Sequence, residues 1–520
     1  MSSGILLDRE VLDAFNKINF ECLKQIIFII NKLKSSERVI TKAFFYKNFS
    51  EIRKLSVDDS TKLAIDSIFP LENIPAGESE SENALEKSET DSVKLITSPF
   101  IVPKKVCVQD FVNHFKSRYE AIKKIFEEKN LENLTSIRKI GSKRESYTII
   151  VAIVEKRITK NKNILLEVED LTGKASVLIN QNKKELFEKA KDLLGDEIVA
   201  LKVSGSSEML FANDVIFPDA FLGEKRRHDK DVWAAFISDI HSGSTMFLEE
   251  NFCKFIDWLN GNVGDKNQKE ISKKVRYLFV NGDLVDGVGH FPGQERWLNV
   301  LEMKGQYSKL IEHFKRIRDD IKIIIAPGNH DAVWLGEPQP VIGEEWAPDL
   351  YKMKNVSLVT NPALVEIEGG FRILMYHGAS MHGMINEIEE LRLKQGSNTP
   401  TKVIKEILKR RHFAPTHGSV DYIPCEKEDA LVIKQIPDIL TTADLHRHEV
   451  STYNNILLIA TSCWQSLTPF QEKVGNHPDF CKVPLFNLKS REVKIIDFFE
   501  DKEGEKAVEA VKVAENGTGK

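Results

Sequence analysis

The sequence has few cysteines, and their spacing matches neither a common metal motif nor a disulfide framework. Its 520 residues include six cysteines, none of which forms a C-x-x-C pair. A zinc ribbon requires clustered cysteines, and a small disulfide-linked fold requires many of them in a short chain. We therefore expect reduced, structural cysteines.

The sequence also lacks a long hydrophobic run near its N-terminus. Residues 26–30 form the longest apolar run there, between Lys24 and Lys32. A membrane-spanning helix requires about 20 apolar residues, so this run is far too short. Charged residues at 8–10 interrupt any signal-like apolar region. We expect a cytoplasmic protein without a membrane partner.

A large excess of positive charge is absent as well. The formal net charge of −5 argues against a protein that coats nucleic acid through bulk electrostatics. Contacts with nucleic acid would then come from local patches or from a partner protein. The basic runs 225–227 and 409–412 are candidates, although a solvated loop or helix face explains each of them equally well.

The residue pattern divides the chain into five segments. Residues 1–70 have helical spacing and predict a small helical N-terminal domain, whereas 71–95 are rich in Glu and Ser and predict a flexible acidic linker. Residues 105–222 predict an amphipathic helix at 109–128 followed by a β-rich domain. Strands alternate with helices over 231–499, and 500–520 predict a disordered tail.

The β-rich domain has a recognisable order of elements. Between residues 146 and 217, alternating apolar residues predict three strands, a helix and two further strands. This is the order of an oligonucleotide-binding (OB) barrel. The barrel could hold DNA or simply join domains, because no run of exposed aromatic residues marks a stacking platform.

Polar clusters follow five apolar runs within 231–499. The clusters are Asp239-x-His241, Gly282-Asp283, Gly328-Asn329-His330-Asp331, His377 and Asp444-x-His446. A polar turn would explain one such cluster. Five of them after predicted strands instead indicate a common site, because sites in α/β sheets lie at the carboxyl ends of strands.

The residue types in these clusters are those of a two-metal phosphoesterase centre. Two divalent ions about 3.5–4 Å apart can activate a water molecule and hold a phosphodiester for in-line attack. Mixed imidazole and carboxylate ligands suit Mn²⁺ or a similar borderline ion better than Mg²⁺ alone. Asp283, which follows Gly282 at a strand end, is the expected bridging ligand.

The order of the clusters resembles the calcineurin-like metallophosphoesterases, whose pattern is D-x-H, G-D, G-N-H-D/E, H and G-H-x-H. Within them, residues 106–499 are similar to the small, exonuclease subunits of archaeal family D DNA polymerases. The segments that carry this resemblance are SDIHSGS (238–244), GDLVDGVGHFPGQE (282–295), APGNHDA (326–332), LKRRHFAP (408–415) and WQSLTPFQ (464–471).

The resemblance implies an α/β fold in which a layered metallophosphoesterase β-sandwich is flanked by helices. The OB barrel and the small helical domain would precede it. It also implies a 3′–5′ exodeoxyribonuclease that removes mismatched nucleotides from DNA 3′ ends during replication. The partner would be the large catalytic subunit of a heterodimeric polymerase, and a sliding clamp or a primase is a further candidate for the N-terminal domain.

The resemblance also implies a role for each cluster. One metal ion would be held by Asp239, His241, Asp283 and His446, and the other by Asp283, Asn329, His377 and Asp444. His330 would lie beside the scissile phosphate, where it stabilises charge or protonates the leaving 3′-oxygen. Asp331 would orient His330.

The sequence departs from the family pattern at its last cluster. The G-H-x-H motif falls on residues 443–446, so Asp444 stands where the family has its first histidine. A slip of two residues would instead align His446 and His448 with the motif. Loop residues His290 and His382 are given no ligand role.

Asp444 leaves three functions open. An aspartate can bind the same ion with a changed metal preference, which leaves the exonuclease intact. A decayed centre would instead make the chain a structural subunit. A phosphoesterase with a different substrate would have the same core ligands, because neither the fold nor the metal centre fixes the substrate.

Overall fold

The computed structural model describes residues 6–7, 39–40, 93–97, 105–394, 396–425, 428–499 and 509–510. The chain divides into two units, 1–89 and 90–520. In the first unit the structure describes a parallel strand pair, β1 (Leu6–Leu7) and β2 (Val39–Ile40). The rest of the predicted helical domain lies outside the described residues, as does most of the predicted linker. No described helix is long and apolar enough to span a membrane.

Two β-sheets form the centre of the second unit. Their strand orders are β12-β11-β10-β9-β18-β19-β20 and β16-β17-β15-β14-β13-β3. The first sheet contains β9 (Trp233–Ile237), β10 (Val275–Asn281), β11 (Lys322–Ala326), β12 (Val356–Leu358), β18 (Lys482–Asn487), β19 (Val493–Asp497) and β20 (Glu509–Ala510). The second sheet contains β3 (Val93–Thr97), β13 (Ala363–Ile367), β14 (Phe371–Met375), β15 (Ile439–Thr442), β16 (Glu449–Tyr453) and β17 (Ile456–Ala460).

The two sheets pack face to face between layers of helices. Phe236, Phe279 and Met375 lie in the core between the sheets, whereas the neighbouring residues Ile237 and Val280 point into the core beneath the outer helices. A strand that is buried on both faces requires a continuous apolar run, which explains the runs that end at the five polar clusters. The predicted layered α/β arrangement is confirmed.

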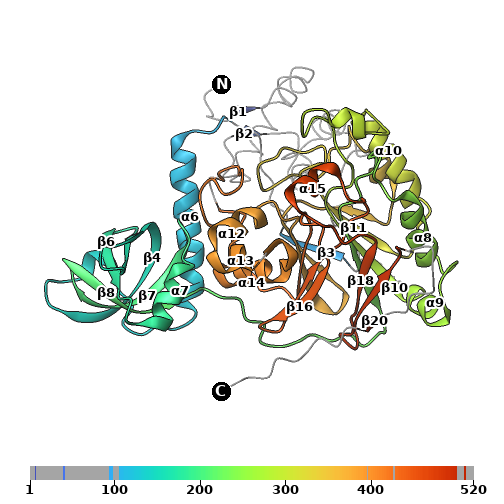
Figure 1. The fold of residues 1–520 in the computed structure, drawn as a ribbon. Coiled ribbons are helices and arrows are strands. Elements are labelled where there is room, and N and C mark those ends of the chain that lie inside the picture. The colour runs from blue at the N-terminus through green and yellow to red at the C-terminus, as the bar shows by residue number, and fades with distance from the viewer. Residues whose placement is uncertain are drawn as a thin grey trace, which may run out of the picture. The chain divides into compact units, whose positions relative to one another are not determined.

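Helices cover the outer face of each sheet (Figure 1). The core beneath the first sheet includes residues of α8 and α10, and the core beneath the second includes residues of α12, α13 and α14. The helices of this part of the chain are α8 (Glu249–Leu259), α9 (Lys266–Ser272), α10 (Met303–Phe314), α11 (Pro348–Lys352), α12 (Met381–Glu387), α13 (Glu389–Leu393), α14 (Pro400–Arg410) and α15 (Pro469–Val474).

A small closed barrel precedes the sandwich, and its order of elements is the predicted one. The strands pair in the order β4-β5-β6-β8-β7. The elements are β4 (Glu145–Ile158), β5 (Ile164–Asp170), β6 (Gly173–Ile179), α7 (Lys184–Lys191), β7 (Ile198–Ser206) and β8 (Met209–Ile216). The Asp170 carboxylate accepts hydrogen bonds from the backbone N–H groups of Thr172 and Gly173, at 2.7 and 2.9 Å, which fixes the tight turn between β5 and β6.

Two predicted boundaries are corrected by the sheets. Residues 93–95, placed at the end of the acidic linker, belong to β3, which pairs antiparallel with β13. β3 contains β-branched residues such as Val93 and Ile96, which favour a strand at a sheet edge. Within the predicted disordered tail, residues 509–510 form β20, which pairs antiparallel with β19.

The segment LKRRHFAP joins the sandwich to the barrel and to the helix α6 (Val108–Glu127). The Asp429 carboxylate accepts hydrogen bonds from Arg118 of α6 at 2.6 Å and from His412 at 2.8 Å, and His114 lies 3.2 Å away. Arg410 pairs with Glu197, the residue before the strand β7, at 2.8 Å. Arg410, Arg411 and His412 are all buried. The basic run 409–412 is therefore mainly an internal joint, which corrects its interpretation as a nucleic-acid patch.

The buried joint makes stability depend on pH. Burial, reinforced by the Arg118 charge, lowers the pKa of His412 to about 4, whereas the unfolded chain has an ordinary histidine pKa of about 6.5. Between these values the unfolded state binds more protons, so the free energy of unfolding should fall as the pH falls from about 6.5 to about 4.

The His412→Gln variant should show a flatter dependence over this range, because glutamine keeps an N–H donor for Asp429 and does not titrate. Chemical denaturation at a series of pH values measures the difference. The exposed His477→Gln change serves as the control and should follow the wild type. If the free energy of unfolding depended on pH equally in His412→Gln and in the wild type, His412 would not be the source of the pH dependence.

Candidate metal centre

Five strand ends bring the predicted site residues together. β9, β10 and β11 are parallel neighbours in one sheet, and β14 and β15 are parallel neighbours in the other. Their carboxyl ends therefore lie at a common edge of the sandwich. Two groups of buried side chains with the geometry to hold a metal ion result, Asp239–His241–His446 and Asp239–Asp283–His377.

The loops after these strands share an uncommon backbone conformation. Asp239, His241, Asp283, Asp444 and His446 all have positive φ angles, between 48° and 65°. Non-glycine residues seldom adopt this left-handed conformation, and they do so mainly where surrounding structure holds them for function. In each of the two D-x-H segments, 239–241 and 444–446, both the aspartate and the histidine have this left-handed conformation.

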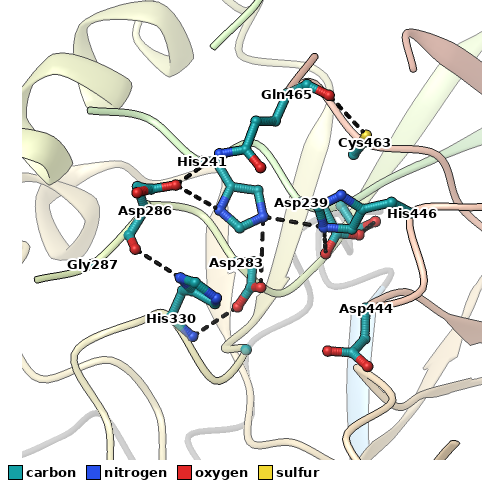
Figure 2. Close-up of polar contacts among 12 residues, drawn as sticks. Asp239, His241, Asp283, Asp286, Gly287, His330, Asp444, His446, Cys463 and Gln465 are labelled. Atoms are coloured by element: carbon teal, nitrogen blue, oxygen red, sulfur yellow. Dashed lines mark hydrogen bonds and ion pairs between the residues drawn. The ribbon is translucent and has the colours of Figure 1, made fainter. Parts of the chain in front are cut away.

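The first group lies between β9 and the loop after β15 (Figure 2). Asp239 Oδ1 is 3.3 Å from His446 Nε2, and His241 Nε2 is 3.2 Å from the same nitrogen. Gln471 of α15 contacts the other ring nitrogen of His446 at 2.9 Å. The segment WQSLTPFQ thus reaches the centre through its last residue, Gln471, and also through Gln465, which donates to Asp286.

Asp283 occupies the position expected of a bridging ligand. Its Oδ2 lies 3.7 Å from His241 Nε2 on one side and 3.4 Å from His377 Nε2 on the other. His377 Nε2 is also 3.8 Å from Asp444 Oδ1. A single carboxylate oxygen therefore faces one imidazole from each of the two predicted ion positions.

The protons on His377 show that this side of the centre suits a cation. Its Nδ1 lies 2.8 Å from the Asn281 carbonyl, which can only accept, so Nδ1 carries the proton. In the neutral ring, the Nε2 lone pair then faces the Asp283 carboxylate. Burial lowers the pKa of His377, but the carboxylates of Asp283, Asp239 and Asp444 together outweigh burial and raise the pKa well above the usual value. The structure thus favours positive charge between these groups.

Unpaired buried atoms support the same conclusion. Among the described residues, Asp239 Oδ1, Asn329 Oδ1 and His377 Nε2 are buried and have no hydrogen-bond partner. Buried polar atoms normally have a partner, and an ion is one explanation when they do not. Each of these atoms is the donor that a metal ligand of its residue type would use. The residues therefore fit a divalent cation.

His330 lies beside the bridging position. Its backbone N–H donates to Asp283 Oδ1 at 2.9 Å, and its Nδ1 contacts the Asp286 carbonyl at 2.7 Å. Because that carbonyl can only accept, Nδ1 carries a proton, and Nε2 carries one only when the ring is positively charged. A role as proton donor through Nε2 therefore requires the imidazolium form of His330.

Asp331 does not orient His330, which corrects its predicted role. Both oxygens of its buried carboxylate are used elsewhere, Oδ1 by the Tyr307 hydroxyl at 2.9 Å and Oδ2 by the backbone N–H groups of Gly328 and Leu284 at 2.8 and 3.3 Å. Burial, with the nearby Asp283 charge, raises the pKa of Asp331 to about 7. Asp331 therefore holds the loop together, while the Asp286 carbonyl positions the His330 ring.

Gly328 allows this loop to approach the bridging residue. A Cβ atom added at Gly328 would lie 2.2 Å from Asp283 Oδ1 and 2.8 Å from the His377 ring. No side chain can occupy that space without moving the centre. The glycine of the G-N-H-D cluster is thus required by close packing and not by its φ angle.

Asp286 belongs to the centre although sequence reasoning did not single it out. Its Oδ1 lies 3.2 Å from His241 Nδ1, and Gln294 and Gln465 donate to its two oxygens at 3.0 and 2.8 Å. It therefore orients His241. Asp286 lies within GDLVDGVGHFPGQE, but it follows the strand end by five residues, so the strand-end rule could not select it.

The remaining histidines differ in position. The structure brings His446 to the centre, whereas the backbone of His448 contacts Asp479, so the shifted register is not the one adopted. The His290 ring stacks on His330 with the ring centroids 4.1 Å apart. His382 Nε2 lies 3.5 Å from Asp444 Oδ2. His290 in a loop and His382, which lies on α12 and not in the predicted loop, are thus neighbours of the centre.

Comparisons with known proteins identify the family. Residues 234–451 match the family model for the B subunit of DNA polymerase alpha/epsilon. The chain is 35% identical over 381 residues to the DNA polymerase II small subunit of Methanothermobacter thermautotrophicus, covering 73% of this chain and 78% of that protein. This chain belongs to the DNA polymerase II small subunit family. The resemblance drawn from the motifs is confirmed.

Two further relatives carry the same name. The DNA polymerase II small subunit of Archaeoglobus fulgidus is 34% identical, covering 85% of this chain and 88% of that protein. The protein of the same name from Pyrococcus furiosus is 35% identical, covering 76% of this chain and 64% of its own length. Among solved structures, an archaeal phosphodiesterase is 14% identical over 51% of this chain and 99% of its own, with a TM-score of 0.25.

A cation that binds this centre should stabilise the folded chain. Saturating Mn²⁺ should raise the midpoint of thermal unfolding, because an ion that binds only the folded state adds about 2.7 kcal/mol at 100 times its dissociation constant. The Asp283→Asn change should remove most of the increase. Differential scanning calorimetry with and without Mn²⁺ measures it.

The Asp349→Asn change, on α11, is the matched control and should keep the full increase. An equal Mn²⁺ effect in the wild type and in Asp283→Asn would show that the ion binds elsewhere.

Proposed function

We propose that the chain is the small subunit of a heterodimeric replicative DNA polymerase and that its centre removes mismatched nucleotides from DNA 3′ ends. Asp283, which faces an imidazole from each predicted ion position, is the observation that carries this proposal. Two divalent ions, with Mn²⁺ expected, would activate water and neutralise phosphodiester charge when bound. The large catalytic subunit is the expected partner, since the family name denotes a small subunit.

Each residue of the centre has a defined task in this proposal. Asp239, His241, Asp283 and His446 would hold one ion, and Asp283, Asn329, His377 and Asp444 the other. Asp286 keeps the His241 ring in place through its 3.2 Å contact. His330, held by the Asp286 carbonyl, would face the phosphate and donate a proton to the leaving 3′-oxygen in its imidazolium form.

The loop between β10 and α10 supports a nucleic-acid substrate. It presents exposed Phe291 and Trp297 in the same segment as His290, which stacks on His330. Hydrogen bonds attach it to the loop after His241, from Thr245 N–H to the Trp297 carbonyl at 2.8 Å and from Asn299 N–H to the Gly243 carbonyl at 2.7 Å. Exposed aromatic rings beside a phosphodiesterase centre suit the stacking of unpaired bases.

The barrel is consistent with the same substrate. Its element order is that of an OB barrel, and Arg144 lies over the half-exposed Phe211 ring at 5.6 Å. Single strands bind such barrels through basic and aromatic side chains. We propose that the barrel has the OB fold and contacts the DNA strand that leads to the centre.

Nucleotide release tests the activity. With Mn²⁺, the intact polymerase complex should remove nucleotides from labelled DNA that ends in a 3′ mismatch. The His330→Ala change should lower the rate by about 10²–10⁴-fold, the range expected for loss of a proton donor. Mn²⁺ binding should persist, because His330 is not one of the proposed ligands.

The His477→Ala change on an exposed loop is the matched control and should leave the rate unchanged. Complete absence of nucleotide release from the wild-type complex with Mn²⁺ would rule out the proposed exonuclease.

Strand binding tests the aromatic loop. The double change Phe291→Ala and Trp297→Ala should weaken binding of single-stranded DNA by about tenfold or more, because each stacked base contributes about 1–3 kcal/mol. Fluorescence anisotropy of a labelled oligonucleotide measures the affinity. The exposed Phe221, between the barrel and β9, supplies the control change Phe221→Ala. Unchanged affinity in the double variant would show that this loop does not bind the DNA strand.

One observation favours a second function. Asp444 replaces a histidine of the family pattern, so a structural subunit with a degenerate centre is the alternative. Mn²⁺ binding at one position with no nucleotide release would favour that alternative. Release from a different class of phosphoester alone would favour a phosphoesterase with another substrate.

A further inference from the structure

Asp444 faces one imidazole on each side. Its Oδ1 lies 3.8 Å from His377 Nε2, at the second proposed ion position, and its Oδ2 lies 3.5 Å from His382 Nε2. His377 is fully buried, whereas the His382 side chain is 60% exposed. Asp444 thus connects the interior of the centre with a histidine at its rim.

The local backbone brings His382 to this place. His377 ends the run from β14, and Gly378 follows with a φ of 136°. The Met381 N–H donates to the Gly378 carbonyl at 2.8 Å, so α12 begins directly after this turn and carries His382 in its first turn. A Cβ atom added at Gly378 would lie 3.1 Å from the Cβ atom of Asp444. The turn therefore packs directly against Asp444.

A simple stabilising ion pair does not explain the contact. Pairs between exposed side chains contribute little to stability, and His382 is mostly exposed. Asp444 also has a left-handed backbone, with a φ of 65°, and its Oδ2 has no hydrogen-bond partner among the described residues. At 3.5 Å, His382 is close enough to form that bond after a small rotation of its ring.

We propose that His382 and Asp444 act as a matched imidazole–carboxylate pair at the second ion position, in which the His382 Nε2–H fixes the carboxylate through Oδ2 while Oδ1 faces the ion. His382 is thus a positioning residue and not a ligand. This inference depends on the proposed metal centre. In this pair, His382 holds Asp444 in the orientation in which Oδ1 can bind the ion. Groups that orient metal ligands commonly change the affinity for the metal by about 10–100-fold.

The pair predicts which changes damage the centre. Asp444→His alone places two imidazoles together and leaves the His382 N–H without its acceptor. His382→Asp alone places two carboxylates together, and their like charges repel. The double exchange, His382→Asp with Asp444→His, restores one imidazole and one carboxylate. Coupling of this kind between two positions is what a double-mutant cycle detects.

Calorimetric titration of the full-length chain with Mn²⁺ tests the proposal, and the electron paramagnetic resonance signal of bound Mn²⁺ counts the ions. The wild type should bind two ions. His382→Leu should weaken the second ion by about tenfold or more, whereas His382→Gln, which keeps an N–H donor, should bind more tightly than His382→Leu. Each single exchange should weaken the second ion, and the double exchange should recover most of the lost affinity.

A matched control separates this effect from general damage. His228 also faces a carboxylate, Glu368 at 3.8 Å, but it precedes β9 at the opposite end of the strand from the centre. His228→Leu should bind two ions like the wild type. Thermal unfolding without Mn²⁺ identifies any variant that has lost its fold, and the remaining variants then decide the question.

Two results would contradict the His382–Asp444 pair without contradicting the proposed metal centre. The first is wild-type affinity for both ions in His382→Leu, and the second is a double exchange that binds no better than the single exchanges. A wild-type chain that binds no Mn²⁺ would instead contradict the proposed metal centre on which the pair depends.

Discussion

The Asp283 carboxylate lies between His241 and His377, and the rest of the centre depends on this arrangement. Burial disfavours the charged form of a carboxyl group, but the imidazoles of His377, His330 and His241 together hold the pKa of Asp283 well below its usual value. Asp239 and Asp283 are both buried and both favour ionisation. Buried carboxylates this close together require positive charge between them, which protonated imidazoles or bound cations can supply.

The sandwich provides the stiffness that this arrangement requires. Apolar strands buried on both faces end at the centre, so each polar cluster is anchored to a strand that cannot shift without opening a core. Left-handed residues such as Asp239 and Asp444 sit where these strands stop. Their unfavourable backbone conformations persist because hydrogen bonds and packing hold the loops from several directions.

The proposed activity depends on Asp444, because this residue departs from the family pattern. Asp444 has a left-handed backbone, a largely buried carboxylate and an imidazole on each side. The interface formed by Asp429 and Arg410 is a separate structure. It joins α6 and the barrel to the sandwich through buried charges and accounts for a basic segment that, in the sequence, resembled a surface patch.

The sequence determined the layered α/β architecture and the types of polar residue at the strand ends. Continuous apolar runs followed by Asp, His or Asn predict buried strands with a site at their ends, and the run 323–326 before Asn329 is the clearest case. The alternation of apolar residues over the barrel predicted its order of elements, because the periodicity of a strand is a local property of the sequence. The N-terminal helical domain stays a prediction, since it lies outside the described residues.

Only the tertiary structure decided which side chains meet. Asp286 reaches His241, Asp331 turns toward Tyr307, and His382 faces Asp444 across 62 positions of sequence. None of these contacts follows from spacing, because each depends on the direction in which a loop leaves its strand. Apolar periodicity records which face of a strand is buried, whereas a polar contact between distant loops is set by the packing of the two sheets.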